Sequence, residues 1–457
     1  MKNNYVLALV CALLITAQGV QFGQEQATRV VETGQTVSLT LSVAIQRALE
    51  YNKDILIAKE DVKKSDAQIG EAYSNAFPHI TLEATYTRYI ELPVLFLPPN
   101  TAFNPSSATQ TIKLGSDNSF SVGASLSQVL FNAKVNNAIR IAEDYEAFNR
   151  QNLQATTEDV ILAVKQTFYG VLLLRKVVEV NREGLDLASA NFENVKLLFK
   201  EGLVSEFDLL RAEVQKANQE PEVSKAENNL EVAMNALRNL LGYPLDQPIE
   251  IGEDLELQEI PEMTLRNESP FLLEKNSTLK GLRYLERIYD RNIAIEESDY
   301  YPTLAAFSQY QYQTQDNTFD FSKFNWATNF LVGLQVSYPI FSGWSTKNRV
   351  QQAEIDKEKA TLTRLKAEDG LQIQARDAEL KMLEAKKRIS AQTKTAEQAQ
   401  RAVEIATVRF KSGMGTQLEL IDAQVALSRS RTLEAQSVYD YMAARAQWER
   451  LTGYTAQ

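Results

Sequence analysis

The stretch Phe199-Lys200-Glu201-Gly202-Leu203-Val204-Ser205 has a counterpart 211 positions later, Phe410-Lys411-Ser412-Gly413-Met414-Gly415-Thr416. The same offset aligns Leu241-Gly242 with Thr452-Gly453, and no gap is needed. A period of about 200 residues is far longer than the 20–50 residues of solenoid repeats. The chain is therefore predicted to contain two copies of one large structural unit.

Each copy combines two strand-like stretches with two long helical ones. Apolar and polar residues alternate with a period of two in both pairs of strands, as in strands that have one apolar face. Long helical stretches follow, run up to the repeated glycine and then return, which predicts side-by-side packing as in coiled coils. The predicted strands cover 79–90, 119–131, 303–313 and 329–341, with a proline-rich loop at 91–118, and the predicted helices cover 134–200, 206–241, 346–411 and 418–451.

The predicted organisation begins with a signal peptide, because Lys2 is followed by the apolar run 6–15, which is too short to span a bilayer. Within the first returning helix, Pro221 predicts a kink or a restart. The predicted parts are the signal peptide 1–19, a flexible polar leader 20–38, the first structural repeat 39–242, a connector 243–268 and the second structural repeat 269–457.

Composition argues against several classes of function. A net charge of −11 does not suit a nucleic-acid partner, which would require a basic face. The one cysteine, Cys11, lies within the apolar run, so the mature chain would have no disulfide framework. The one histidine, His79, stands beside Pro78 at a strand entrance and suits a structural junction better than catalysis. We expect no enzyme activity, no cofactor and no metal site.

The strands set a constraint on assembly. Each has about the 9–11 residues of a strand that crosses an outer membrane, and a sheet in lipid must close because its edge groups would otherwise stay unpaired. Single-chain barrels start at about eight strands, whereas this chain offers four. If the strands cross a membrane, several chains must share one barrel. The alternative is a pair of hairpins on a soluble sandwich.

Each hairpin tip carries the signals of a tight turn between helices. A glycine suits the left-handed position after a helix, and a hydroxyl residue three positions later suits the N-cap of the next helix. An acidic residue follows at the capping-box position. The glycines are Gly202 and Gly413, and the predicted caps are Ser205 with Asp208 and Thr416 with Glu419.

Capping explains the glycines and the hydroxyl residues, but it does not explain apolar residues at an exposed turn. Their presence suggests a docking surface for another protein. This predicted surface comprises Gly202, Leu203, Val204 and Ser205 on the first tip and Gly413, Met414, Gly415 and Thr416 on the second.

Glu419 and Asp422 lie three residues apart on the first turn of the second returning helix, so they share one face. In a symmetric assembly they would form two acidic rings around the axis, and such rings favour cations. Complementation of the helix dipole explains the two acids equally well. Both interpretations remain open from the residues alone.

Taken together, the signal peptide, the duplicated halves and the tips with the pattern Phe-Lys-x-Gly-x-x-Ser/Thr-x-x-Asp/Glu resemble the TolC-type outer-membrane efflux proteins. Leu41-x-x-Ala44-Ile45-x-x-Ala48-Leu49-x-x-Asn52 and Ala76-Phe77-Pro78 also match, and the resemblance covers essentially everything after residue 38. It implies an α+β membrane protein with four antiparallel transmembrane strands per chain. It also implies a homotrimer with a 12-stranded β-barrel in the outer membrane of a Gram-negative bacterium and a 12-helix α-barrel in the periplasm.

The resemblance further implies a passive exit duct of a tripartite efflux or type I secretion system. Its partners would be a periplasmic adaptor (membrane fusion) protein at the tips, an inner-membrane transporter and outer-membrane lipid. Glu419 and Asp422 would match the acidic constriction of the closed tip. Gly415 stands where the best-known member has a basic residue that helps to hold the tip shut, so the latch must differ. The alternative function is a periplasmic or surface coiled-coil spacer without a pore.

Overall fold

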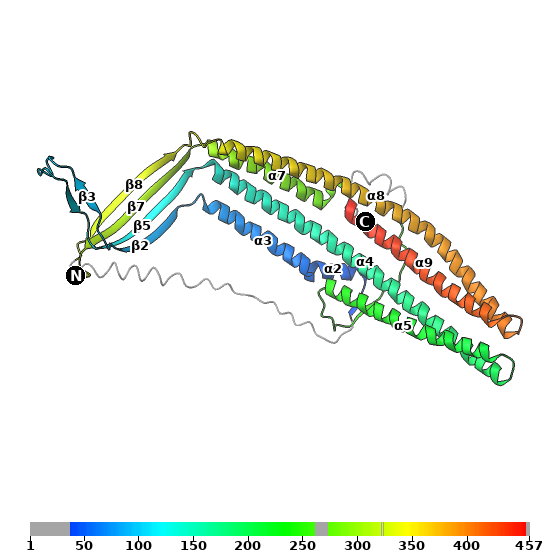
Figure 1. Cartoon of the computed structure of the whole chain (residues 1–457). Helices are drawn as coiled ribbons and strands as arrows, with labels where there is room; N and C mark the ends of the chain where they lie inside the picture. The colour runs from blue at the N-terminus through cyan, green and yellow to red at the C-terminus, as the bar shows by residue number, and fades with distance from the viewer. Residues whose placement is uncertain (1–36, 261–272, 321, 323, 454–457) are drawn as a thin grey trace.

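The computed structural model describes residues 37–260, 273–320, 322 and 324–453, so the expected signal peptide lies outside the described residues. The described chain is a long, bowed body (Figure 1). A twisted sheet occupies one end, and long helices run from it to two helix–turn–helix tips at the other end. None of the helices in these ranges is long and apolar enough to cross a bilayer.

The first helices begin and end at polar caps. The side chain of Thr40 accepts a hydrogen bond from the backbone N–H of Val43 and starts α2 (Leu41–Tyr51). Asn52 ends α2, and its side chain caps α3 (Lys53–Ser74) by accepting from two backbone N–H groups. Orphan N–H groups at a helix start are satisfied in this way.

Next to α2, a short parallel ladder joins distant parts of the chain. β1 (Val37–Leu39) pairs with β6 (Ile249–Ile251), which lies within the expected connector. The polar leader that we expected to reach residue 38 therefore gives way to a strand at Val37.

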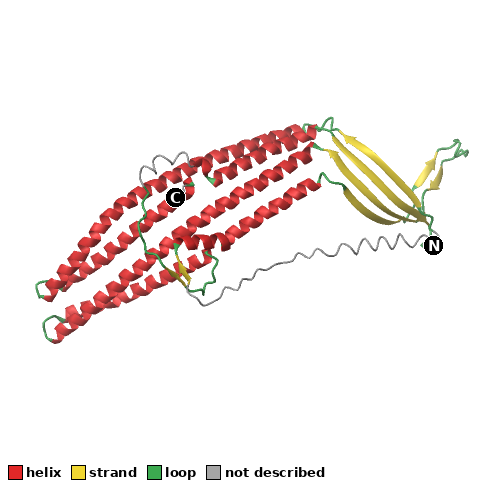
Figure 2. Ribbon diagram, turned by 180° about the vertical axis from the view of Figure 1, so that it is seen from behind, coloured by secondary structure: helices red, strands yellow, loops and turns green. Residues whose placement is uncertain are grey.

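The four expected strands form one antiparallel sheet (Figure 2). Their order is β2-β5-β7-β8, so β2 and β8 are the edges (Figure 1). β8 ends at Ser337, earlier than the expected 341, because Pro339 has no N–H to donate to a ladder. The strands are β2 (His79–Arg88), β5 (Asn118–Phe131), β7 (Thr303–Asp316) and β8 (Ala327–Ser337).

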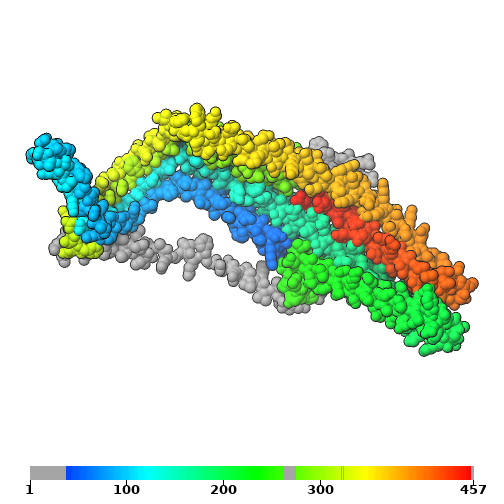
Figure 3. All heavy atoms as spheres, viewed as in Figure 1, coloured from blue at the N-terminus to red at the C-terminus, as the bar shows by residue number. Residues whose placement is uncertain are grey.

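The segment 91–118, which we expected to be a loop, contains a second hairpin. β3 (Val94–Leu97) pairs antiparallel with β4 (Gln110–Lys113), and Leu95 lies opposite Ile112. This hairpin stands away from the main sheet (Figure 3). The sequence does not reveal these two strands, because each has only four residues and prolines flank the first of them.

Four long helices form the body of the molecule. Although Pro221 was expected to kink or restart the second of them, that helix continues through it. Pro221 is exposed and its neighbours Val223 and Ala226 are buried, so packing holds the helix where one backbone hydrogen bond is missing. The helices are α4 (Ala133–Lys200), α5 (Glu206–Leu240), α8 (Ser345–Lys411) and α9 (Gln417–Thr452).

A shorter helix, α7 (Ser277–Glu297), lies between α4 and α8 near the sheet, flanked by the 3₁₀ turns η1 (Leu273–Lys275) and η2 (Ser298–Tyr300). The helices near the sheet therefore follow the order α3-α4-α7-α8, and those toward the tips follow α5-α4-α9-α8. α5 and α3 lie on the same side as the sheet edge β2, and α8 lies on the side of β8 (Figure 1). Each chain thus has two continuous open sides.

The main core lies at mid-length, where α2, α4, α8 and α9 meet. Trp448, Phe168 and Met382 are fully buried there. Burial raises the pKa of Tyr169, in the same cluster, to about 12, so its phenol stays neutral. This core fixes the directions in which the two helix hairpins extend.

Candidate functional site

Both tips end the descending helix with the same backbone motif. In the first, the N–H of Gly202 donates to the carbonyl of Phe199 and the N–H of Leu203 donates to that of Leu198. Gly413 and Met414 repeat the pattern in the second tip. The glycines have φ of +72° and +70°, the left-handed conformation that glycine adopts without a Cβ penalty. The repeated sequence therefore encodes a repeated turn.

The first tip carries a complete capping box. The hydroxyl of Ser205 accepts from the N–H of Asp208 at 3.2 Å, and the Asp208 carboxylate accepts in turn from the N–H of Ser205 at 3.2 Å. Two otherwise unpaired donors at the start of α5 are satisfied. This geometry accounts for both residues as caps.

The second tip has only half of that box. The hydroxyl of Thr416 accepts from the N–H of Glu419 at 3.2 Å. The Glu419 carboxylate instead lies 3.7 Å from the guanidinium of Arg409, on the other side of the turn. The reciprocal bond that we expected at this tip is therefore replaced by an ion pair between α8 and α9.

Arg409 makes a second contact within the same turn. Its guanidinium donates to the carbonyl oxygen of Met414 at 3.2 Å. A Cβ at Gly415 would come within 2.9 Å of the Cβ of Arg409, so only glycine fits this position without a shift. Arg409 was not among the site residues predicted from the sequence, although it stands directly before the repeated Phe410.

The apolar residues of the tips differ in exposure. Leu203 and Met414 are each 71% exposed, whereas Val204 and Gly415 are half-buried. Each tip therefore presents one protruding apolar side chain rather than two.

The two acids expected at a constriction both face solvent on α9 in the single chain. Glu419 has the ion pair with Arg409, whereas Asp422 has no ion pair within the described part of the chain. Of the two, Asp422 carries the uncompensated charge.

At the opposite end of the molecule, the sheet has one apolar and one polar face. Cross-strand partners share a face, and the register places Leu82 beside Ala124, and Tyr310 beside Phe330, on the apolar face. The three large side chains among them, Leu82, Tyr310 and Phe330, are exposed in the single chain, by 66% for Leu82. The polar face carries Thr81, Thr85, Ser121, Ser125, Gln309, Gln311, Gln313 and Asn329.

Aromatic rings gather at the outer end of the sheet. Tyr86 stacks on Phe120 with ring centroids 4.6 Å apart, and Tyr312 stacks on Trp326 at the same distance. Such rings suit the interface between lipid and water.

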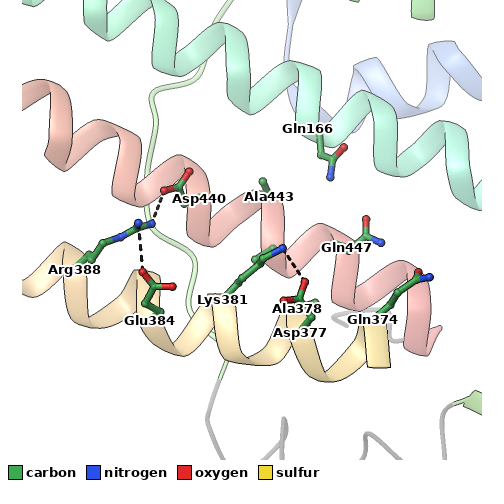
Figure 4. A pocket seen from close by; sticks show the side chains of 11 residues that line it. Gln166, Gln374, Asp377, Ala378, Lys381, Glu384, Arg388, Asp440, Ala443 and Gln447 are labelled. Carbon is green, nitrogen blue, oxygen red and sulfur yellow. Dashed lines mark hydrogen bonds and ion pairs between the residues drawn. The ribbon is translucent and has the colours of Figure 1, made fainter. Parts of the chain in front are cut away.

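A hollow of about 480 Å³ lies at mid-length between α4, α8 and α9 (Figure 4). Its charged groups are paired: Lys381 with Asp377 at 2.7 Å, and Arg388 with both Glu384 and Asp440. Gln166 and Gln447 supply amides (Figure 4). These satisfied pairs suit helix packing rather than acid–base chemistry, and the described residues contain no cluster of three or more metal-binding side chains.

The sequence profile of a known family matches most of the chain. The outer membrane efflux protein family matches residues 44–243 and 271–454. The two matched segments include most of α2, the four strands of the main sheet, the four long helices and both tips.

Two characterised proteins are similar in sequence. The alkaline protease secretion protein AprF of Pseudomonas aeruginosa is 21% identical over 327 residues, which cover 68% of this chain and 66% of that protein. The cobalt-zinc-cadmium resistance protein CzcC of Cupriavidus metallidurans is 26% identical over 310 residues, which cover 65% of this chain and 68% of that protein. The chain thus aligns with about two thirds of each relative.

Solved structures share the fold over nearly the whole length. The CmeC outer membrane channel of Campylobacter jejuni superimposes with a TM-score of 0.74 at 16% identity, covering 93% of this chain and 90% of that one. The outer membrane protein VceC of Vibrio cholerae gives 0.72 at 16% identity, covering 90% and 96%.

Proposed function

The chain belongs to the outer membrane efflux protein family, and from this premise we propose that three copies assemble into one exit duct. The duct conducts substrates passively from a periplasmic adaptor and an inner-membrane transporter to the cell exterior. The main sheet spans the outer membrane, and the helices extend into the periplasm. The observation that carries the proposal is a sheet with a lipid-compatible face and two unpaired edges.

The edges require partners. β2 and β8 each pair on one side only, and an unpaired row of backbone groups cannot stand in hydrocarbon. β2 runs outward and β8 runs back, so the β8 edge of one copy can continue the β2 edge of the next in antiparallel order. Three copies of a four-stranded sheet give a closed barrel of twelve strands.

The open sides of the helical body support the same assembly. On α5, Phe207, Leu210 and Val214 follow helical spacing and are exposed by 64%, 52% and 56%. On α8, at a similar distance from the tips, Ile405 and Val408 are exposed by 51% and 66%. Apolar stripes on the two sides of one chain suit burial against neighbouring copies.

The tips serve as the docking surface in this proposal. Leu203 and Met414 protrude from the helix ends farthest from the sheet, where a periplasmic adaptor would meet them. Glu419 and Asp422 would face the axis on the first turn of α9 and form the acidic constriction. Arg409 would stabilise the turn that carries them.

Disulfide trapping tests the shared barrel. Thr85→Cys in β2 is combined in turn with Ala327→Cys, Asn329→Cys and Leu331→Cys in β8, all on the polar face. One of these pairs is expected to give covalent trimers on a non-reducing gel. Cys11 is replaced by serine in every variant, so that only the introduced thiols react.

The control places one cysteine in a central strand instead. Ser121→Cys in β5, combined with the same β8 cysteines, is expected to yield no linked trimer because both neighbours of β5 belong to its own chain. Wild-type protein should also conduct ions in planar bilayers. A detergent-free monomer that forms no cross-links and no pore would favour the coiled-coil spacer instead.

A further inference from the structure

The polar face of the main sheet carries a single acidic side chain. Glu83, in the middle of β2, is exposed, and it forms no ion pair with any described residue. Apart from His79 at the strand end, every other residue on this face of the four described strands is uncharged. Arg88 and Asp316, the other charged residues of these strands, lie on the opposite face at the outer end.

The row that contains Glu83 places no side chain directly opposite it on the neighbouring strand. Gly123 lies directly opposite Glu83, Gln311 opposite Gly123, and Asn329 opposite Gln311. A Cβ at Gly123 would come within 3.1 Å of the carbonyl oxygen of Tyr310, so a side chain there would fit tightly. The residue opposite Glu83 thus contributes no side chain, and the row supplies amides but no cation that could neutralise the carboxylate.

We propose that Glu83 is the residue that sets charge selectivity in the membrane-spanning part of the duct, where it favours cationic over anionic solutes. This inference rests on the proposed trimer, in which the polar face lines the lumen and three copies of Glu83 lie at one level. Glu83 is five residues from the outer end of β2, or about 17 Å along the strand. It therefore acts far from the acids of the tips, at the other end of the molecule.

The expected size of the charge selectivity follows from the surroundings of the ring that the three Glu83 carboxylates form. Carboxylates at the wall of a water-filled lumen act through a high dielectric and are screened over about 8–10 Å in physiological salt. The ring therefore biases ion passage without blocking it. We expect removal of its charge to lower the permeability ratio of K⁺ over Cl⁻ about threefold, which is the scale of a screened charge at short range.

Reversal potentials in planar bilayers under a KCl gradient test the inference. The purified full-length trimer is compared with Glu83→Gln, which keeps the shape of the side chain, and Glu83→Lys, which reverses its charge. The K⁺/Cl⁻ permeability ratio is expected to fall about threefold in Glu83→Gln and to drop below one in Glu83→Lys. The measurements are repeated with Glu419→Gln and Asp422→Asn present, so that the acids of the tips do not contribute.

Thr85→Gln is the matched control. It places the same side chain as Glu83→Gln on the same face, two residues along β2, without changing the charge. It should leave the ratio at the wild-type value. If wild-type protein conducts and Glu83→Gln has the same ratio as wild type, the role of Glu83 is overturned. If wild-type protein forms no pore, the proposed duct itself fails.

Discussion

The guanidinium of Arg409 on α8 lies 3.7 Å from the carboxylate of Glu419 on α9, across the second hairpin turn. The same guanidinium donates to the carbonyl of Met414, and the Cβ of Arg409 lies so close to Gly415 that a side chain there would clash with it. A basic group is therefore present at this tip although position 415 is glycine. It bridges the two helices of one chain and offsets the charge of Glu419, one of the two acids at the start of α9.

Replacement of Arg409 tests this bridge. Arg409→Gln should change the stability of the assembly by less than about 1 kcal/mol, because both partners are about half exposed. It should raise the K⁺/Cl⁻ permeability ratio, because Glu419 loses its counter-charge. Arg401→Gln is the control, since Arg401 pairs with Glu404 on its own helix. Equal ratios in the two variants would show that the bridge has no effect on the duct.

The two acids of α9 should contribute unequally. Asp422→Asn is expected to lower cation preference about threefold, and Glu419→Gln less than about twofold, because only Glu419 is already paired. Block of the current by spermine, added on the periplasmic side, provides a second measurement. We expect Asp422→Asn to weaken this block more than Glu419→Gln does. A larger effect of Glu419→Gln would assign the constriction to Glu419 and leave Asp422 as a helix-dipole partner.

The glycines of the tips can be tested through their backbone conformation. Gly202→Pro and Gly413→Pro cannot adopt the observed φ of +72° and +70°, because proline fixes φ near −65°. We expect export of a substrate of the partner pump to be lost while heat-sensitive trimers remain in the membrane. Gly202→Ala should cost only about 1 kcal/mol and retain export, because no atom lies within 4 Å of its Cβ. Full export in both proline variants would rule out docking at the tips.

Phe307 and Gly333 form a tightly packed pair on the polar face of the sheet. A Cβ at Gly333 would lie 2.6 Å from the ring of Phe307, its cross-strand partner. Gly333→Ala should therefore destabilise the sheet by about 1–3 kcal/mol, as other overpacked sites do. The temperature at which trimers dissociate on a gel measures this change. Adding Phe307→Leu should restore part of the lost stability. If Gly333→Ala trimers dissociate at the same temperature as wild type, Phe307 does not pack tightly against Gly333.

Asp144 on α4 forms ion pairs with two arginines of α7. It is 5% exposed and pairs with Arg287 at 2.7 Å and with Arg291. Asp144→Ala should destabilise the assembly by about 2–4 kcal/mol, because it leaves a partly buried arginine without its partner. Asp356→Ala, which breaks an exposed pair with Lys359, should cost below about 1 kcal/mol. Similar denaturation midpoints for both variants would show that the ion pairs of Asp144 add little to the stability of the assembly.

Features that depend on local sequence could be predicted from the chain alone. The alternation in β2 and β5 predicts strands because period two follows from backbone geometry. Gly202 predicts the helix end because glycine readily adopts the positive φ that such an end requires, and the structure shows this φ. The restart expected at Pro221 was wrong for the opposite reason, because α5 continues through this residue. Its intrinsic cost is local, but the packing of α5 against α4, which compensates for it, is not.

The contacts that require the fold could not be predicted. Arg409 meets Glu419 only because the turn brings two helices together, and neither residue type specifies that partner. The pairing of Val37 with Ile249 joins residues that are distant in sequence, and no periodicity encodes it. Glu83 is visible in the sequence as a polar residue on a strand, but its isolation becomes clear only when all four strands are in register.

The order of the strands has a consequence for biogenesis. β5 pairs with β7, so Asn118 can form its ladder contact only after Asp316 has been exported. The edge strand β8 is complete only when Ser337 has left the export machinery. Helix hairpins such as α4–α5 join neighbouring segments and can form early, whereas such distant pairings are slow. A newly exported subunit therefore passes through a stage in which its helix hairpins are folded and its strands are still unpaired. Unpaired strands are prone to aggregate, so a periplasmic chaperone would need to protect the subunit at this stage.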